Sequence, residues 1–408
     1  MFALPTGAQR SLSPWDPRLS ELAIPLLVHR VARFVGPEQL SNQLDAHERE
    51  LSHRGASFRY RAESIRPVLD GFRAFVELTD GGTTYSVTWP DSVLRLAKLG
   101  GQLRELRGGM PGSIVKKYAA DLLDNNAADF LFELDTATHY RIQGFHVEWY
   151  EAGHAAGPEF AVQGGGYDFD VECRRFSDNL LDKVSEKSVL LLTDKLIEFL
   201  GSRGLAGTLK VALPRDFSVS PAMERELGQY CQAVEPGSAK ATLGSGLVVE
   251  GELMPEGTCR FSQRELDGFI PKDLLREWVS LSAKRHGDLG SLPLVLRLQG
   301  PQRSFDDFQK MLETTLKDKV KRQLRSDRPG ILAVKFEGLD DPSIFEEAPM
   351  QQFMRGLFKS QHLAGLLIQG RSLEERIKEG VYTRSNAIFF KNPSTVFPEV
   401  ANLRHSGG

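Results

Sequence analysis

The chain has little cysteine and no long apolar segment. Its 408 residues include 3 cysteines, Cys173, Cys231 and Cys259, an odd and scattered set without Cys-x-x-Cys spacing. This usage argues against a disulfide framework and against a zinc site, and it predicts free thiols in a reducing cytoplasm. Apolar runs such as 189–192 fall far short of the roughly 18–20 residues needed to cross a bilayer. We therefore expect no membrane association.

An excess of charge of either sign is also missing. The 51 basic and 54 acidic side chains give a net charge of −3. Without a global positive field, a nucleic-acid partner has to be met by a local basic patch. The segment 1–18 has neither a basic stretch nor a continuous apolar one, so we expect no secretory signal and predict a cytoplasmic location.

What is present is typical of a globular protein, with 41% hydrophobic and 26% charged residues. In the N-terminal part, hydrophobic periodicity predicts a helix, a β-hairpin and a second helix, with apolar helical positions from Leu22 to Phe34, strands at 72–78 and 84–88, and a helix at 92–107. Pro111-Gly112 then marks a boundary. We place an α+β N-terminal domain before it, at 1–112.

Beyond this boundary, helices and strands alternate. The predicted order is two helices, three strands and a helix, at 114–125, 127–143, 145–151, 159–163, 167–176 and 183–200. Further strands are predicted at 209–213, 247–253, 294–298, 331–336, 364–368 and 387–390, with helices at 305–324 and 350–358. Apolar strands that alternate with helices favour a sheet covered on both faces, so we predict an α/β fold.

Candidate catalytic residues gather on the predicted strand 167–176. A period of two gives this strand an apolar and a polar face, and the polar face carries Asp168, Asp170, Glu172 and Arg174. Glu159 begins the preceding strand, and the short glycine connection makes the two strands antiparallel neighbours. Glu159 and Glu172 can then approach one another and bridge one hard divalent cation. The alternative is an amphipathic strand whose polar face is simply solvated.

A third acid, Glu133, lies in the predicted helix before this sheet. It falls at the edge of the apolar stripe that contains Phe130 and Leu134. A carboxylate that points toward a core needs a partner, which a metal ion or a pairing side chain within the helix could supply.

A basic segment follows much later in the chain. Residues 317–328 include six basic and two acidic side chains. The candidate nucleic-acid contacts in it are Lys317, Lys319, Lys321, Arg322, Gln323 and Arg325. A solvated helix face is the alternative explanation of the same pattern.

Three short motifs together carry a family resemblance. The order Phe132-Glu133-Leu134, Pro158-Glu159 and Val171-Glu172-Cys173-Arg174-Arg175 resembles the restriction-endonuclease-like PD-(D/E)xK nuclease superfamily, in particular uncharacterised bacterial members whose last motif reads Val-Glu-Cys-Lys-Arg. The resemblance spans about 130–176. It implies a mixed sheet flanked by helices and metal-dependent hydrolysis of phosphodiester bonds, in DNA more often than in RNA.

The resemblance also implies roles for single residues. Glu159 and Glu172 would hold Mg²⁺ or Mn²⁺, with Glu133 as a ligand or as an anchor for one, and Arg174 would contact the scissile phosphate. Two positions depart from the family pattern, because Glu159 replaces an aspartate and Arg174 replaces a lysine. The second matters more, since an arginine can clamp a phosphate but stays protonated and cannot deprotonate water.

This departure keeps two other readings open. One is a catalytically silent nucleic-acid-binding or scaffolding protein of the same fold, and the other is an interaction protein in which the motif is a coincidence. A homo-oligomer or a protein partner is compatible with each reading. If the segment after 301 closes the nuclease-like core, its parts are 113–200 and 301–400, with an inserted α/β module at 201–300 and a flexible tail at 401–408.

Overall fold

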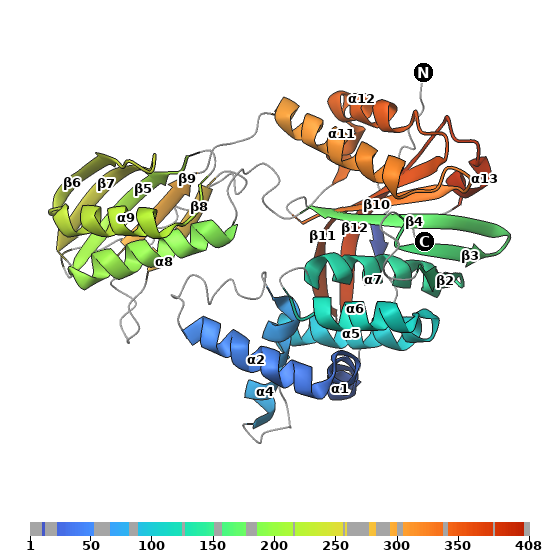
Figure 1. Cartoon of the computed structure of the whole chain (residues 1–408), viewed down its shortest axis with the longest axis horizontal. Helices are drawn as coiled ribbons and strands as arrows, with labels where there is room; N and C mark the ends of the chain where they lie inside the picture. Colours follow the sequence, from blue (N-terminus) through green and yellow to red (C-terminus); the bar gives the residue numbers. More distant parts are fainter. Residues whose placement is uncertain are drawn as a thin grey trace. The chain divides into compact units, whose positions relative to one another are not determined.

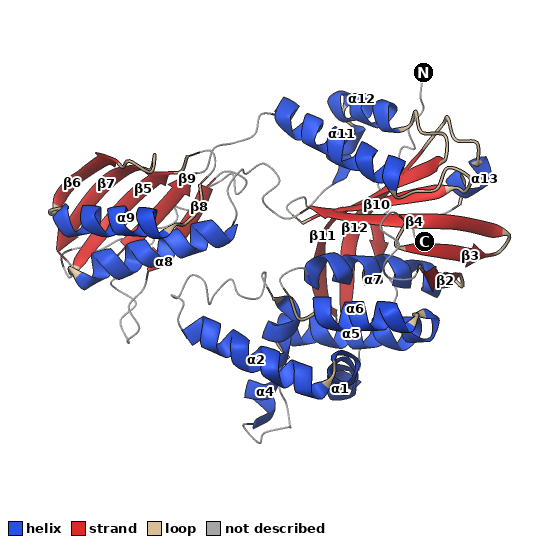
Figure 2. Ribbon diagram, in the orientation of Figure 1, coloured by secondary structure: helices blue, strands red, loops and turns tan. Residues whose placement is uncertain are grey.

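The computed structural model describes residues 10–12, 23–52, 66–80, 89–124, 127–150, 157–176, 186–214, 217–255, 258, 277–282, 294–299, 305–337, 342–377 and 380–403. The chain divides into two compact units, one formed from 1–47, 62–178 and 309–408, and the other from 48–61 and 179–308. Both are mixtures of helices and strands (Figure 2), as the α/β prediction requires. Within the described part of the chain, no helix combines the length and apolarity needed to cross a bilayer.

A seven-stranded mixed sheet forms the centre of the first unit, in the order β1-β12-β11-β10-β4-β3-β2. Its strands are β1 (Arg10–Leu12), β2 (His146–Trp149), β3 (Phe160–Gly164), β4 (Tyr167–Phe176), β10 (Gly330–Phe336), β11 (Leu363–Ile377) and β12 (Gly380–Lys391). β2, β3 and β4 make an antiparallel meander, whereas β10 runs parallel to both β4 and β11. The tight β3–β4 turn depends on Gly165 and Gly166, whose φ angles of 60° and 84° are easily adopted only by glycine.

Helices cover both faces of this sheet (Figure 1). One side carries α1 (Ile24–Val35), α2 (Pro37–Ser52), α4 (Pro67–Asp80), α5 (Asp91–Leu106), α6 (Gly112–Asp121) and α7 (Ala127–Ile142). The other side carries α11 (Phe305–Arg322) and α12 (Ala348–Leu357), and the short α13 (Pro398–Ala401) follows β12. α7 packs directly on β4, where the rings of Tyr140 and Phe169 meet edge to face with centroids 5.3 Å apart.

The N-terminal part departs from the sequence prediction. Residues 72–78, predicted as a strand, lie inside helix α4, and 84–88 lies outside the described residues. Leu69, Phe72 and Phe75 are buried at helical spacing, which outweighs the alternation seen in the sequence. The described helices of 1–112 join β4 and β10 in one hydrophobic core, so this segment does not have the separate α+β core that we expected.

The second unit contains a five-stranded sheet in the order β6-β7-β5-β9-β8. Its elements are α8 (Glu186–Ser202), β5 (Leu205–Ala212), α9 (Pro221–Ala233), β6 (Gly237–Thr242), β7 (Val248–Pro255), β8 (Glu277–Ser282) and β9 (Leu294–Gln299). Leu192, Leu196 and Leu200 of α8 are buried in the core of this sheet. α8 therefore belongs to the inserted module. The module begins before this helix, and not at 201 as predicted.

Gly100 allows α1 and α5 to pack backbone to backbone. A Cβ at this position would overlap the backbone carbonyl oxygen of Leu27. We expect Gly100→Ala to destabilise the protein by about 1–3 kcal/mol because the two helices must separate. Urea denaturation would measure this, with Gly112→Ala as the control, since a Cβ at Gly112 meets nothing within 4 Å. Equal stability of the two variants would contradict a tight helix crossing.

Candidate active site

Glu172 is the central acidic residue of the first unit. It lies on β4 opposite Leu332 of β10, and its side chain is fully buried. Oε1 accepts a hydrogen bond from Nζ of Lys319 at 2.6 Å, and the same ammonium group donates to Oε1 of Gln323 at 2.6 Å. Oε2 is buried and has no hydrogen-bond partner among the described residues. One of the two carboxylate oxygens of Glu172 is therefore left without a hydrogen bond.

Glu133 is held by a buried chain of hydrogen bonds. The hydroxyl of Tyr118, on α6, donates to Oε2 of Glu133 at 2.5 Å, and Nε1 of Trp149, on β2, donates to the Tyr118 hydroxyl at 3.1 Å. All three side chains are buried. The helix carboxylate thus has a protein partner, as its position on the apolar stripe requires, but sequence reasoning did not identify Tyr118. Only its helical spacing beside α7 could have suggested it.

Glu159 is fixed beside β4 by its own backbone. Its N–H donates to the carbonyl of Val171 at 3.0 Å, immediately before β3 begins. This bond extends the antiparallel β3–β4 pairing beyond Phe160 and Val171 by one residue, which places Glu159 opposite Glu172.

The three carboxylates interact electrostatically in this buried region. Burial, followed by the charge of Glu159, raises the pKa of Glu172 to about 8. The same two causes hold the pKa of Glu133 well above its ordinary value, and burial raises the pKa of Glu159. The structure therefore brings together the three acids that the motifs singled out, and it places them where a full set of negative charges is unfavourable.

Two lysines approach this acidic group from different helices. Lys117 on α6 lowers the pKa values of Glu133 and Glu159, and Lys319 on α11 lowers those of Glu159 and Glu172. Nζ of Lys117 also lies 5.1 Å from the ring centroid of Phe130. Even with both cations, burial remains the largest influence on each acid.

Arg174 follows Glu172 on the same face of β4 but is held differently. Its guanidinium carbon lies 5.7 Å from the ring centroid of Phe176, and its Nε is buried without a hydrogen-bond partner in the described structure. Its charge lowers the pKa of Glu172. Arg174 thus contributes positive potential to the site.

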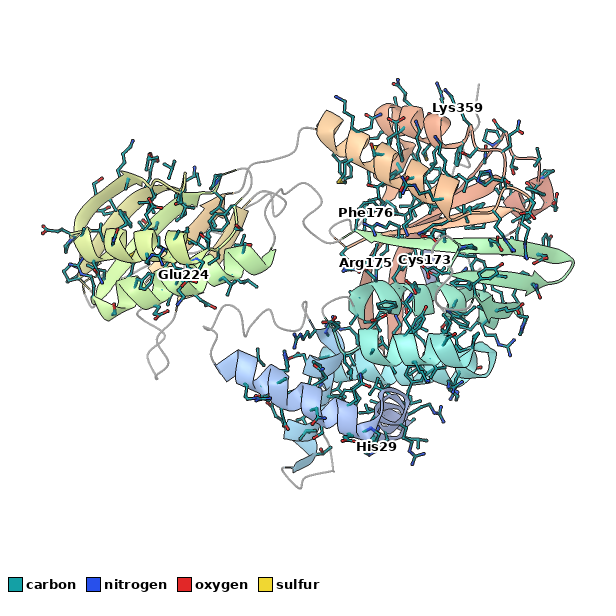
Figure 3. The ribbon with its side chains drawn as sticks, in the orientation of Figure 1. His29, Cys173, Arg175, Phe176, Glu224 and Lys359 are labelled. Atoms are coloured by element: carbon teal, nitrogen blue, oxygen red, sulfur yellow. The ribbon has the colours of Figure 1, made fainter. Side chains whose placement is uncertain are left out.

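The opposite face of β4 is structural. Cys173 is buried, with a thiol pKa held well above its ordinary value mainly by burial. Arg175 pairs with Asp129 of α7, with 2.7 Å between Nε and Oδ1. Figure 3 labels both residues on β4, the strand between the helical layers.

Asp170 and Asp168, which lie on the predicted polar face of the strand, are engaged by arginines. The two oxygens of buried Asp170 receive Nε and Nη2 of Arg325 at 2.8 and 2.9 Å, and Oδ1 also accepts from the Tyr150 hydroxyl at 2.6 Å. Arg328 pairs with Asp168. These contacts fasten the segment after α11 to β4, and they leave neither aspartate as a ready metal ligand.

The predicted nucleic-acid contacts are distributed over three environments. Lys319 and Arg325 bind the acids Glu172 and Asp170 of β4, and Gln323 accepts a hydrogen bond from Lys319. Lys317 pairs with Glu313, and Arg322 pairs with Asp318 at 2.6 Å, both along the helix. Lys321 is exposed. The segment therefore does not present a continuous basic face, because several of its charges are neutralised by neighbouring carboxylates.

The donor set fits a hard cation, although its present arrangement is not that of a formed metal site. Among the described residues, no group of three or more His, Cys, Asp or Glu side chains is positioned to hold a metal ion. Oxygens of Glu133 and Glu172 are bonded to Tyr118 and Lys319 instead. Carboxylate oxygens are the ligands that Mg²⁺ and Mn²⁺ prefer, and the unpartnered Oε2 of Glu172 is a buried acceptor for one.

Comparisons of the chain with protein-family models, with curated proteins and with solved structures found no match.

The raised pKa of Glu172 predicts how the stability of metal-free protein changes with pH. A carboxyl whose pKa is higher in the folded than in the unfolded state stabilises the fold at low pH, and this contribution is lost as pH rises from the unfolded value toward about 8. In EDTA, the urea midpoint should therefore fall less steeply between pH 5 and 8 in Glu172→Gln than in wild type, because the variant lacks the group that loses its proton in this range. Parallel curves would show that Glu172 titrates normally.

Tyr118 should be important for stability because its hydroxyl serves two buried partners. Tyr118→Phe leaves Glu133 without its donor and Trp149 without its acceptor, which we expect to destabilise the protein by about 1–3 kcal/mol. Guanidinium denaturation would measure the loss. Tyr167→Phe is the matched control, with an expected change within roughly 0.5 kcal/mol. Similar losses in both variants would argue against a special role for the Tyr118 hydroxyl.

Proposed function

We propose that this protein is a metal-dependent nuclease that hydrolyses phosphodiester bonds, in DNA in preference to RNA, on a restriction-endonuclease-like core. The observation that carries the proposal is the proximity of Glu133, Glu159 and Glu172, in which desolvation raises the pKa of all three and the charge of Glu159 further raises those of Glu133 and Glu172. Proteins retain such a costly arrangement where chemistry needs it, so strongly perturbed carboxylates are candidates for function.

The order of elements supports the proposal. Helix α7 carries Glu133, the β2-β3-β4 meander follows with Glu159 and Glu172, and β10 then lies parallel to β4 after helix α11. The segments on which the family resemblance rests are thus consecutive parts of one sheet and its covering helices. The second unit is inserted between β4 and α11, which agrees with an insertion in a nuclease-like core.

Each side chain then has a role in hydrolysis. Glu159 and Glu172 would hold Mg²⁺ or Mn²⁺, with Glu133 as the third carboxylate. When bound, the ion supplies Lewis-acid polarisation of the phosphate and lowers the pKa of a bound water. Burial of Glu133 and Glu172 excludes bulk water and strengthens their attraction for a cation, and Glu159 remains partly exposed. Arg174 and Lys117 add positive potential for a polyanion.

A silent nucleic-acid-binding protein is the second candidate, and one contact favours it. Lys319 binds Oε1 of Glu172 and so already supplies a positive charge to the carboxylate that would hold a metal ion. If this pairing were permanent, the site would be neutralised and only binding would remain. Binding of that kind should weaken with salt and be insensitive to EDTA.

A cleavage assay separates the two candidates. Single- and double-stranded DNA and RNA incubated with the protein in Mg²⁺ or Mn²⁺ should show cleavage of at least one substrate, DNA first, and EDTA should abolish it. Glu172→Gln should slow cleavage by about 100-fold or more, since it removes a ligand charge without changing side-chain size. The matched control is Glu148→Gln, an exposed glutamate on β2, which should cleave like wild type.

Two results would contradict the proposal. Cleavage that survives Glu172→Gln would move the activity to another site or to a contaminant. Salt-sensitive binding without cleavage, unaffected by EDTA, would establish the silent-binding alternative.

A further inference from the structure

Lys319 contacts the central acid from a distant part of the sequence. It follows Glu172 by 147 residues, because the inserted unit separates the two in the sequence, yet Nζ of Lys319 and Oε1 of Glu172 are 2.6 Å apart. Neither residue gains this contact from local structure. The fold itself brings an ammonium group to the acid that the proposed function needs most.

The two partners differ in accessibility. The side chain of Glu172 is 0% exposed, whereas that of Lys319 is 22% exposed. An ammonium group on a flexible four-carbon stem can therefore reach both the buried carboxylate and solvent. Glu172 and Gln323 accept two of its three N–H donors, and the described structure shows no partner for the third.

The ion pair between Lys319 and Glu172 satisfies only one of the two carboxylate oxygens, unlike a fully hydrogen-bonded buried salt bridge. A buried carboxylate is stabilised when both oxygens are satisfied, and a half-satisfied one is costly. Here Oε2 of Glu172 is left without a partner. By contrast, both oxygens of Asp170, two residues earlier on the same face, receive hydrogen bonds from Arg325. The structure thus contains one completed acid–base pair and one incomplete pair.

We propose that Lys319, and not Arg174, is the catalytic cation of this site, an inference that rests on the proposed nuclease function. Without metal, Lys319 neutralises Glu172. With Glu172 holding a divalent cation, the ammonium group of Lys319 would no longer be needed to neutralise this carboxylate and would donate to a non-bridging oxygen of the scissile phosphate. In the hydrolysis, the oxygen of water bonds to phosphorus, the ester P–O bond breaks, and the departing oxygen takes a proton from water. Lys319 exchanges no atom and stabilises the negative charge that develops.

Arg174 is less suited to this role. Its guanidinium lies over Phe176 and its Nε is buried, so its position is constrained by its own strand. Lysine also has the more adaptable geometry, since its three donors rotate freely around one charge.

The test compares Lys319→Met and Lys319→Arg with Lys310→Met, which removes an exposed lysine from the same helix. Cleavage is followed in single turnover, and Mn²⁺ binding to the free protein is followed by calorimetry. We expect Lys319→Met to cleave about 100-fold more slowly but to bind Mn²⁺ more tightly than wild type, because the competing cation is gone. Lys319→Arg should cleave at an intermediate rate, and Lys310→Met should match wild type.

The outcomes separate this inference from the proposed function. Wild-type cleavage by Lys319→Met would overturn the catalytic role, and joint loss of Mn²⁺ binding and cleavage would show a structural ion pair. If wild-type protein cleaves no substrate, the nuclease proposal fails and Mn²⁺ binding decides about Lys319. Tighter binding by Lys319→Met would still support its exchange with metal at Glu172, whereas unchanged or weaker binding would overturn it.

Discussion

Burial of negative charge beside β4 is the constraint on which the rest of the site depends. Glu133 and Glu172 are buried and Glu159 is partly exposed, and each of the three carboxylates loses more from desolvation than the nearby lysines return, which is why their pKa values are raised. Taken alone, the arrangement destabilises the charged form of the protein. It becomes favourable only with added positive charge, which can come from a proton, from Lys319 or from a divalent cation.

β4 can hold these acids because its two faces have separate tasks. On one face, Phe169 and Val171 are buried in the core that α7 covers. On the other, Asp170 and Glu172 meet the basic side chains of α11 and the segment after it. The Asp170 pair is fully satisfied and fixes that segment, so its rigidity allows the neighbouring Glu172 pair to remain incomplete. One strand thereby combines a structural contact with a reactive one.

The parts of the site that sequence could predict are those set by local geometry. A strand period of two and a glycine turn were sufficient to pair Glu159 with Glu172, and helical spacing pointed Glu133 inward. Tyr118 and Lys319 were not assigned to these acids, because their contacts arise only from tertiary packing. The basic segment was interpreted as a nucleic-acid surface because charges alone do not show where they point. The strand predicted at 72–78 is part of helix α4, because short apolar runs do not distinguish a strand from a buried helix.

The inserted unit explains why the lysine and the acid are far apart in sequence but adjacent in space. An insertion is tolerated where the chain leaves and returns to neighbouring points, and here the chain departs after β4 and comes back through α11 to β10, the strand beside β4. The N–H of Glu337, after β10, even donates to the carbonyl of Phe176 at the end of β4. This bond continues the parallel pairing of β4 and β10 past the end of β10. A long-range pair such as Lys319–Glu172 can then be as well defined as a local one, because strand pairing, and not the length of the insertion, sets its geometry.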